Sequence, residues 1–254
     1  MTTLTWGDLV WVIGVDEAGR GPVIGPLIVG AFMAPAEDGT FLRELGVEDS
    51  KCLNKKQREQ VAQKLRLHAQ ERGWQWTVVE LSPDRIDAAV AVNGLNLLEA
   101  EGFGECIASL WTNEHPLELH LDACDVDAVR FGTRVGQALQ ALEHEADRIR
   151  SWHGADEESP HVAAASILAK TTRDAWMAKF SEAVGFQAGS GYPSDPATKK
   201  ALPLLLQGAT PHPDLRWSWA TTKRAWEDLH GTKAPVRTER GVLQQTRLFD
   251  PPSS

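Results

Sequence analysis

Four acidic residues stand out in this chain by where they fall in the sequence: Asp16, Glu17, Asp122 and Asp156. The first two end the apolar run VWVIGV and precede the turn Gly19-Arg20-Gly21, and Asp122 ends the run LELHL. Carboxylates without a cluster of histidine or cysteine are the ligands expected for Mg²⁺ or Mn²⁺, and they disfavour zinc. Two such ions beside a phosphodiester could activate a water molecule and stabilise the leaving oxygen.

Each acid also has an ordinary structural explanation. A single aspartate at the end of a strand is usually a turn or cap residue, so Asp122 alone would be weak support for catalysis. The pair Asp16-Glu17 is stronger evidence for a functional site, because two repelling carboxylates need a compensating cation or metal. The segment DACDVD at 122–127 is not a calcium loop, since Cys124 stands where an oxygen ligand belongs and no glycine follows at the sixth position.

These acids must be positioned by strands and helices, which the sequence pattern predicts. Residues 10–15 and 23–32 are almost entirely apolar, which favours two central strands buried on both faces and joined by the glycine-rich turn. Asn54 is expected to cap a helix that ends at Gly73, residues 74–81 alternate like a strand, and Ser82-Pro83 begins another helix.

The second half of the chain continues the alternation. We expect a helix at 94–111, a strand at 117–122, a helix capped by Asp125 that runs to Leu142, and a weaker strand at 146–152. A long helix then begins at Ser159-Pro160 and ends at Gly185, and further helical segments follow Asp195-Pro196 to about His230. The alternation predicts an α/β fold.

Composition limits the possible functions. The formal charge of −9 and the isoelectric point near 5.4 argue against a protein that holds nucleic acid mainly by bulk electrostatics, although a local basic groove could coexist with an acidic remainder. The three cysteines form no C-x-x-C pair, so neither a disulfide framework nor a zinc site is expected. No signal peptide or membrane span is recognisable, and a reducing cytoplasm fits best.

Six motifs, in this order, resemble the type 2 ribonuclease H family, and specifically ribonuclease HII: VDEAGRGPVIGP, DSK at 49–51, LDACDVD, HGAD at 153–156, AAASILAKTTRD and GSGYPSDP. The resemblance spans about residues 10–230, and LDACDVD and GSGYPSDP are more similar to the archaeal and eukaryotic branch. It implies a ribonuclease H-like fold with a mixed, five-stranded sheet flanked by helices. We expect a catalytic domain at 1–190, a helical C-terminal region packed on it at 191–232, and a flexible tail at 233–254.

The resemblance also implies functional residues. Asp16, Glu17, Asp122 and Asp156 would be the catalytic carboxylates that bind two Mg²⁺ or Mn²⁺ ions. Asp156 is chosen over nearby Asp147 because only Asp156 keeps the family spacing to the alanine-rich helix. The family often has lysine where Gly154 stands, so a local basic contact could be missing.

Substrate contacts are implied as well. The turn Gly19-Arg20-Gly21 resembles the segment whose backbone reads the ribose 2′-hydroxyl, and glycine permits such close approach of the main chain. Arg20 would add a phosphate contact, and Tyr192, the only tyrosine, would pack on the sugar that follows the ribonucleotide. The remaining candidate contacts are Lys51, Asn96, Ser166 and Lys170. For Asn96, a plain amide on a helix face is an equally good interpretation.

The expected reaction is hydrolysis of the RNA strand of RNA/DNA hybrids, and of the phosphodiester 5′ of single ribonucleotides in duplex DNA, by a monomer. The alternatives are a related metal nuclease with another substrate and a non-catalytic adaptor of nucleic acid or of a sliding clamp. In the tail, Gln245, Leu248 and Phe249 resemble the short peptide that bacterial sliding clamps capture, whereas the archaeal clamp motif usually has its aromatic residues farther downstream. A tail with no partner is a slightly better interpretation of so short a match.

Overall fold

A computed structural model describes residues 9–47, 53–144, 146 and 148–237. The chain divides into two compact units. Unit 1 contains the described residues among 1–20, 27–81 and 94–173, and unit 2 contains residues 21–26, 82–93 and the described residues from 174 onward. The candidate residues Lys51, Gln245, Leu248 and Phe249 lie outside the described residues, as does the alternative acid Asp147.

Unit 1 is built on a sheet with the strand order β3-β2-β1-β4-β5. Its strands are β1 (Trp11–Ala18), β2 (Leu27–Pro35), β3 (Gln75–Leu81), β4 (Leu117–Asp122) and β5 (Ile149–Trp152). The pairs β1–β2 and β2–β3 are antiparallel, whereas β1–β4 and β4–β5 are parallel. The predicted mixed, five-stranded sheet is therefore confirmed.

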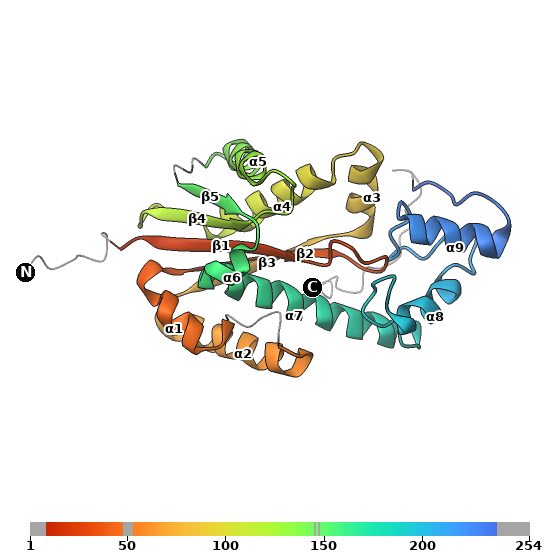
Figure 1. The fold of residues 1–254 in the computed structure, drawn as a ribbon, viewed down its shortest axis with the longest axis horizontal. Helices are drawn as coiled ribbons and strands as arrows, with labels where there is room; N and C mark the ends of the chain where they lie inside the picture. The colour runs from red at the N-terminus through yellow and green to blue at the C-terminus, as the bar shows by residue number, and fades with distance from the viewer. Residues whose placement is uncertain (1–8, 48–52, 145, 147, 238–254) are drawn as a thin grey trace, which may run out of the picture. The chain divides into compact units, whose positions relative to one another are not determined.

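Helices cover both faces of this sheet (Figure 1). In unit 1 they are the 3₁₀ helix at Ala36–Asp38, α1 (Gly39–Glu44), α2 (Lys55–Arg72), α4 (Leu95–Leu110), α5 (Ala128–Ala141), α6 (Ala155–Glu158) and the first part of α7 (Pro160–Val184). Helices α1, α2 and α7 lie on one face, and α4 and α5 lie on the other (Figure 1). The predicted helix cover is present on both sides.

Two glycines let α7 lie directly on the central strands. A Cβ atom at Gly14 of β1 would lie 2.2 Å from the carbonyl carbon of His161, and one at Gly30 of β2 would lie 2.6 Å from the carbonyl oxygen of Ala165. Both distances are shorter than any real Cβ contact, so a side chain at either position would push the helix away from the sheet. The same helix carries two of the candidate site residues, and its close packing fixes their height above the sheet.

Local sequence signals placed several helix ends correctly. Asn54 and Gln57 form the two reciprocal hydrogen bonds of a capping box at the start of α2, and Gly73 ends that helix with a left-handed φ of 72°. Asp195 caps α8 by accepting a hydrogen bond from the amide of Ala197, with Pro196 at the first helical position.

Two local predictions were wrong, and two short helices were not predicted. The second strand begins at Leu27 instead of Val23, because Gly25 has a φ of 83° and Pro26 has no amide hydrogen for the strand ladder. Helix α5 is capped by Asp127, whose side chain accepts a hydrogen bond from the amide of Arg130. Asp125, the predicted cap, instead forms ion pairs with Arg130 and Arg134. The short helices α1 and α6 were not predicted, since segments of six and four residues are too short to show a periodic pattern.

Unit 2 has a core of its own. Its helices are α3 (Pro83–Ala91), the remainder of α7, α8 (Pro196–Leu205) and α9 (Ala220–His230). Buried aromatic and aliphatic residues such as Trp176, Phe180 and Trp226 form one cluster there. Arg216 is fully buried and donates a 3.0 Å hydrogen bond to the carbonyl of Gly25, which ties the segment 21–26 into this unit.

No helix in the described part of the chain is both long enough and apolar enough to cross a membrane.

Candidate active site

Three of the predicted acids meet in unit 1. Asp16 lies in β1, Asp122 is the last residue of β4, and Asp156 lies in α6. One carboxylate oxygen from each lies within 4.8 Å of those of the other two. Asp16 and Asp156 are only 4% exposed, whereas Asp122 is partly exposed. An all-oxygen set at this spacing can hold a divalent cation.

The sheet brings two of these acids together. Because β1 and β4 are parallel and Val15 pairs with Leu121, the residues that follow each of them reach the same edge of the sheet side by side. Asp122 is held there by a 3.0 Å hydrogen bond from the amide of Ala155. Gly154, just before, has a left-handed φ of 71° that turns the chain into α6 and so toward Asp156.

Burial and mutual repulsion make this cluster costly without a cation. Burial, and then the nearby charge of Asp122, raise the pKa of Asp16 to about 7. The Ser166 hydroxyl and the Lys170 ammonium act in the opposite direction. A divalent cation would relieve the same repulsion more completely, because two positive charges would stand among the carboxylates.

Ser166 and Lys170 come to this site from α7. The ammonium of Lys170 donates a 2.7 Å hydrogen bond to Ser166 Oγ and lies 3.9 Å from Asp156 Oδ2. Ser166 is fully buried, and Lys170 is partly exposed. Their spacing of four residues puts both on the helix face that meets the aspartates.

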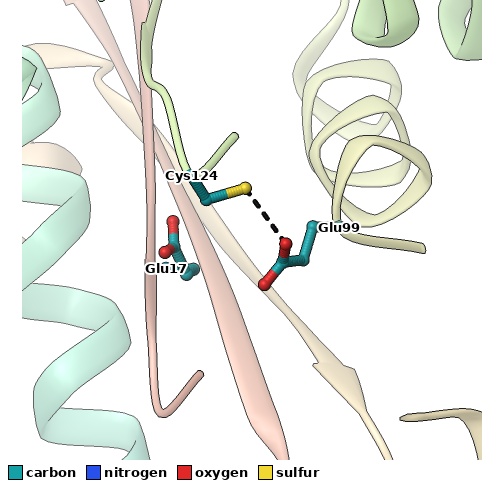
Figure 2. Close-up of side chains that lie close together, drawn as sticks. All are labelled: Glu17, Glu99 and Cys124. Atoms are coloured by element: carbon teal, nitrogen blue, oxygen red, sulfur yellow. Dashed lines mark hydrogen bonds between the residues drawn. The ribbon is translucent and has the colours of Figure 1, made fainter. Parts of the chain in front are cut away.

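Glu17 lies with a different set of ligand atoms. The Glu17 carboxylate lies close to Glu99 of α4 and to Cys124 in the segment after β4 (Figure 2). One ligand atom from each of these three residues lies within 4.8 Å of those of the other two. Strand β1 keeps its regular pairing with β2 through Ala18, so successive side chains point to opposite faces of the sheet. Asp16 therefore faces α7, and Glu17 faces α4. Burial, followed by the charges of Asp16 and Glu99, holds the pKa of Glu17 well above its ordinary value.

Arg20 points inward to the same set of residues. Its guanidinium donates a 2.7 Å hydrogen bond to Asn96 Oδ1, donates to the carbonyl of Cys124, and lies 3.4 Å from Glu99 Oε2. The Asn96 side chain also hydrogen-bonds Asp125. Both predicted substrate contacts, Arg20 and Asn96, thus belong to a polar network between the ends of β1 and β4 and the start of α4.

The other end of the glycine turn belongs to unit 2. A Cβ atom at Gly21 would lie 3.5 Å from the ring of Tyr192, so the ring packs against this glycine. Tyr192 is 41% exposed, which leaves part of the ring open to a ligand. The carbonyl of Gly21 accepts a 3.2 Å hydrogen bond from the indole of Trp219.

Sequence reasoning missed three residues that shape these sites. Glu99, Cys124 and Trp219 received no functional role, although each contacts a predicted site residue. The available signal for Glu99 was its place three residues after Asn96 on one helix face. The indole of Trp219 donates a hydrogen bond to the carbonyl of Gly21 and so holds the backbone of the glycine turn.

Comparison with known proteins gives a consistent result. The model of the family described as Ribonuclease HII matches residues 13–222. Ribonuclease HII of Methanococcoides burtonii is 38% identical over 216 residues, which cover 84% of this chain and 98% of that protein. The crystal structure of ribonuclease H2 from Pyrococcus horikoshii OT3 matches with a TM-score of 0.75 and 36% identity, over 87% of this chain and 100% of that one.

A third match is to a complex. The structure of the PCNA:RNase HII complex from Archaeoglobus fulgidus matches with a TM-score of 0.71 and 33% identity, over 84% of this chain and 96% of that one. All three relatives are archaeal, in agreement with the branch that the motifs indicated, and the predicted ribonuclease H-like fold is confirmed. The chain belongs to the ribonuclease HII family of hydrolases, endonucleases that act on the RNA of RNA/DNA hybrids.

Proposed function

We propose that this protein hydrolyses both the RNA strand of RNA/DNA hybrids and the phosphodiester 5′ of a single ribonucleotide in duplex DNA, leaving 5′-phosphate and 3′-hydroxyl ends. The observation that carries the proposal is the meeting of Asp16, Asp122 and Asp156 within 4.8 Å. Cleavage at single ribonucleotides would give the protein a role in removing them from DNA, which we place in the cytoplasm.

The donor set supports a hard divalent cation. Asp16, Asp122 and Asp156 offer only oxygen, which suits Mg²⁺ or Mn²⁺. Burial, followed by repulsion from Asp122, raises the pKa of Asp16, and a bound cation would favour its charged form. We propose that these three residues and Glu17 hold two such ions. Bound there, the ions would supply activation of water and charge stabilisation at the phosphate.

The remaining proposed roles fall to other side chains and to the backbone of the glycine turn. Lys170 and Ser166 keep Asp156 and Asp16 in position, and the partly exposed ammonium of Lys170 can also face a phosphate. The backbone of the glycine turn reads the 2′-hydroxyl, and the open part of the Tyr192 ring packs on the next sugar. Lys51 remains a proposed phosphate contact from sequence alone.

The decisive test compares three duplexes of one sequence: a full RNA/DNA hybrid, a DNA duplex with one ribonucleotide, and an all-DNA duplex. With Mg²⁺ or Mn²⁺, the first two should be cut and the third left intact, with 5′-phosphate ends on the products. Cleavage of the all-DNA duplex would instead support a nuclease of the same fold with another substrate. Binding of all three without cleavage would support the non-catalytic adaptor.

A sliding clamp is a second proposed partner. A relative of this chain has been solved as a complex with PCNA, and the tail of this chain contains the clamp-like residues Gln245, Leu248 and Phe249. We propose that the monomeric enzyme binds a clamp through this tail. Deleting residues 244–254 should abolish clamp binding while hybrid cleavage persists, and an unchanged affinity for the clamp would contradict the proposal.

A further inference from the structure

Glu99 is a buried carboxylate that connects the two segments that carry the catalytic acids. Its side chain is fully buried in the second turn of α4. Arg20, which approaches it from the end of β1, lies three residues after Glu17, and Cys124, from the end of β4, lies two residues after Asp122. Glu99 thus contacts the continuation of both acid-bearing strands.

The contacts are specific on both sides. The thiol of Cys124 donates a 3.1 Å hydrogen bond to Glu99 Oε2 (Figure 2). The guanidinium of Arg20 lies 3.4 Å from the same oxygen. Arg20 also donates to the carbonyl of Cys124, which closes a ring of three contacting residues.

This buried ion pair adds little to the stability of the fold. A buried ion pair seldom gains more from its Coulomb attraction than it loses in hydration, and apolar residues of the same size would often serve stability equally well. A buried carboxylate that adds so little stability is better explained by the geometry it fixes.

We propose that Glu99 is a positioning residue that, through Arg20 and Cys124, fixes the segment after β1 relative to the segment after β4. Glu17 and Asp122 are thereby held at the spacing that cleavage requires. The inference rests on the proposed function, because the two segments carry the acids of that reaction. Glu99 contacts no reacting atom in this scheme and acts only through its neighbours.

The first test is kinetic. Glu99→Gln keeps the shape of the side chain and an acceptor for Cys124 but removes the charge that holds Arg20. On the duplex with one ribonucleotide, kcat should fall about tenfold, the loss typical of supporting residues around a metal site, with KM changed less than about twofold. The matched control is Glu101→Gln, an exposed glutamate on the same helix, which should behave as the parent.

A double-mutant cycle separates positioning from a general structural effect. If Glu99 acts through Arg20, Glu99→Gln should cost less than about twofold in a background that already carries Arg20→Leu. The pair Glu99→Leu with Arg20→Leu removes both members of the ion pair and keeps the cycle measurable if Glu99→Gln folds poorly. Losses that multiply, or a Glu99→Gln variant as active as the parent, would overturn the proposal.

A second readout needs no activity. In NMR spectra, the guanidinium of Arg20 should give slowly rotating side-chain signals in the parent, assigned by their loss in Arg20→Leu. These signals should broaden in Glu99→Gln and persist in Glu101→Gln. If the parent cleaves no substrate, the proposed function fails, and the spectra alone test the role of Glu99. Signals that broaden in Glu99→Gln would support Glu99 as the residue that holds Arg20. Unchanged signals would overturn that role.

Discussion

Lys170 donates a 2.7 Å hydrogen bond to Ser166, one turn earlier on α7, and its ammonium also lies 3.9 Å from the carboxylate of Asp156. The lysine therefore contacts Asp156 directly and reaches Asp16 through Ser166. Replacing it by glutamine should lower kcat about tenfold, because the carboxylates lose a fixed cation and Ser166 loses its donor. Steady-state cleavage of the duplex with one ribonucleotide measures this loss.

The control for this variant lies on the same helix. Lys179→Gln alters an exposed lysine beyond the site, and its kcat should match that of the parent. Equal activity of Lys170→Gln and Lys179→Gln would contradict the supporting role of Lys170.

The close packing of α7 on β1 predicts a large loss of stability for Gly14→Ala. The added Cβ would lie 2.2 Å from the carbonyl carbon of His161, so strand or helix must shift. Overpacking of this kind costs about 1–3 kcal/mol in the free energy of unfolding, measured by denaturant titration. Gly136→Ala in α5 is the matched control, because its Cβ would meet only a flexible side-chain end at 3.2 Å and alanine favours the helix. A Gly14→Ala protein as stable as the control would show that the helix is not fixed there.

His161 predicts a pH dependence of stability. Burial lowers its pKa to about 4, and its imidazole is only 3% exposed and donates to the carbonyl of Pro35. The unfolded chain, with a histidine pKa near 6.5, binds the proton more readily than the folded chain. The contribution of this neutral imidazole to the free energy of unfolding is therefore fully present above pH 6.5 and is lost as the pH falls toward 4.

The matched variant is His161→Gln, which has no ionisable group at this position. Between pH 7 and pH 5, the parent should lose about 2 kcal/mol more in the free energy of unfolding than this variant. Identical pH profiles for the two proteins would mean that His161 is not held neutral in the fold.

Tyr192 predicts a difference between substrates. Part of its ring is exposed while another part packs on Gly21, which suits a ring that contacts a sugar. Tyr192→Ala should lower kcat/KM on the duplex with one ribonucleotide about tenfold, as expected for one lost aromatic contact with a nucleotide. The long hybrid should be affected less, and Tyr192→Phe, which keeps the ring, should resemble the parent. Equal losses on the two substrates would argue against a role in substrate choice.

The positions of Asp16 and Asp122 could be predicted from local sequence, whereas Glu17, expected beside them, lies with Glu99 and Cys124. Asp16 and Asp122 each follow an apolar run of the sequence, and the parallel pairing of β1 with β4 brings these two positions side by side. Capping signals such as Asn54 with Gln57 also act over a few residues, and the corresponding helix end was predicted correctly.

The failures depend on side-chain contacts that a short sequence pattern does not specify. Asp125 and Asp127 are equally suitable as helix caps, but Asp125 is nearly buried and pairs with Arg130 and Arg134, which leaves the cap to Asp127. Glu99 is one of several glutamates in its helix, and only the approach of Arg20 identifies the one that is buried. No local pattern encodes which of several like residues meets a partner far along the chain.

The central claim is that the carboxylate cluster at the ends of β1 and β4 carries out metal-dependent cleavage at a ribonucleotide. The most direct measurement is the single-turnover rate of Asp16→Asn and of the parent on a DNA duplex with one ribonucleotide in Mg²⁺. The amide keeps the size of the buried side chain but cannot provide the negative charge that a metal needs. We predict a loss of about 100-fold or more, equivalent to several kcal/mol of transition-state stabilisation. A folded Asp16→Asn protein that cleaves as fast as the parent would contradict the account.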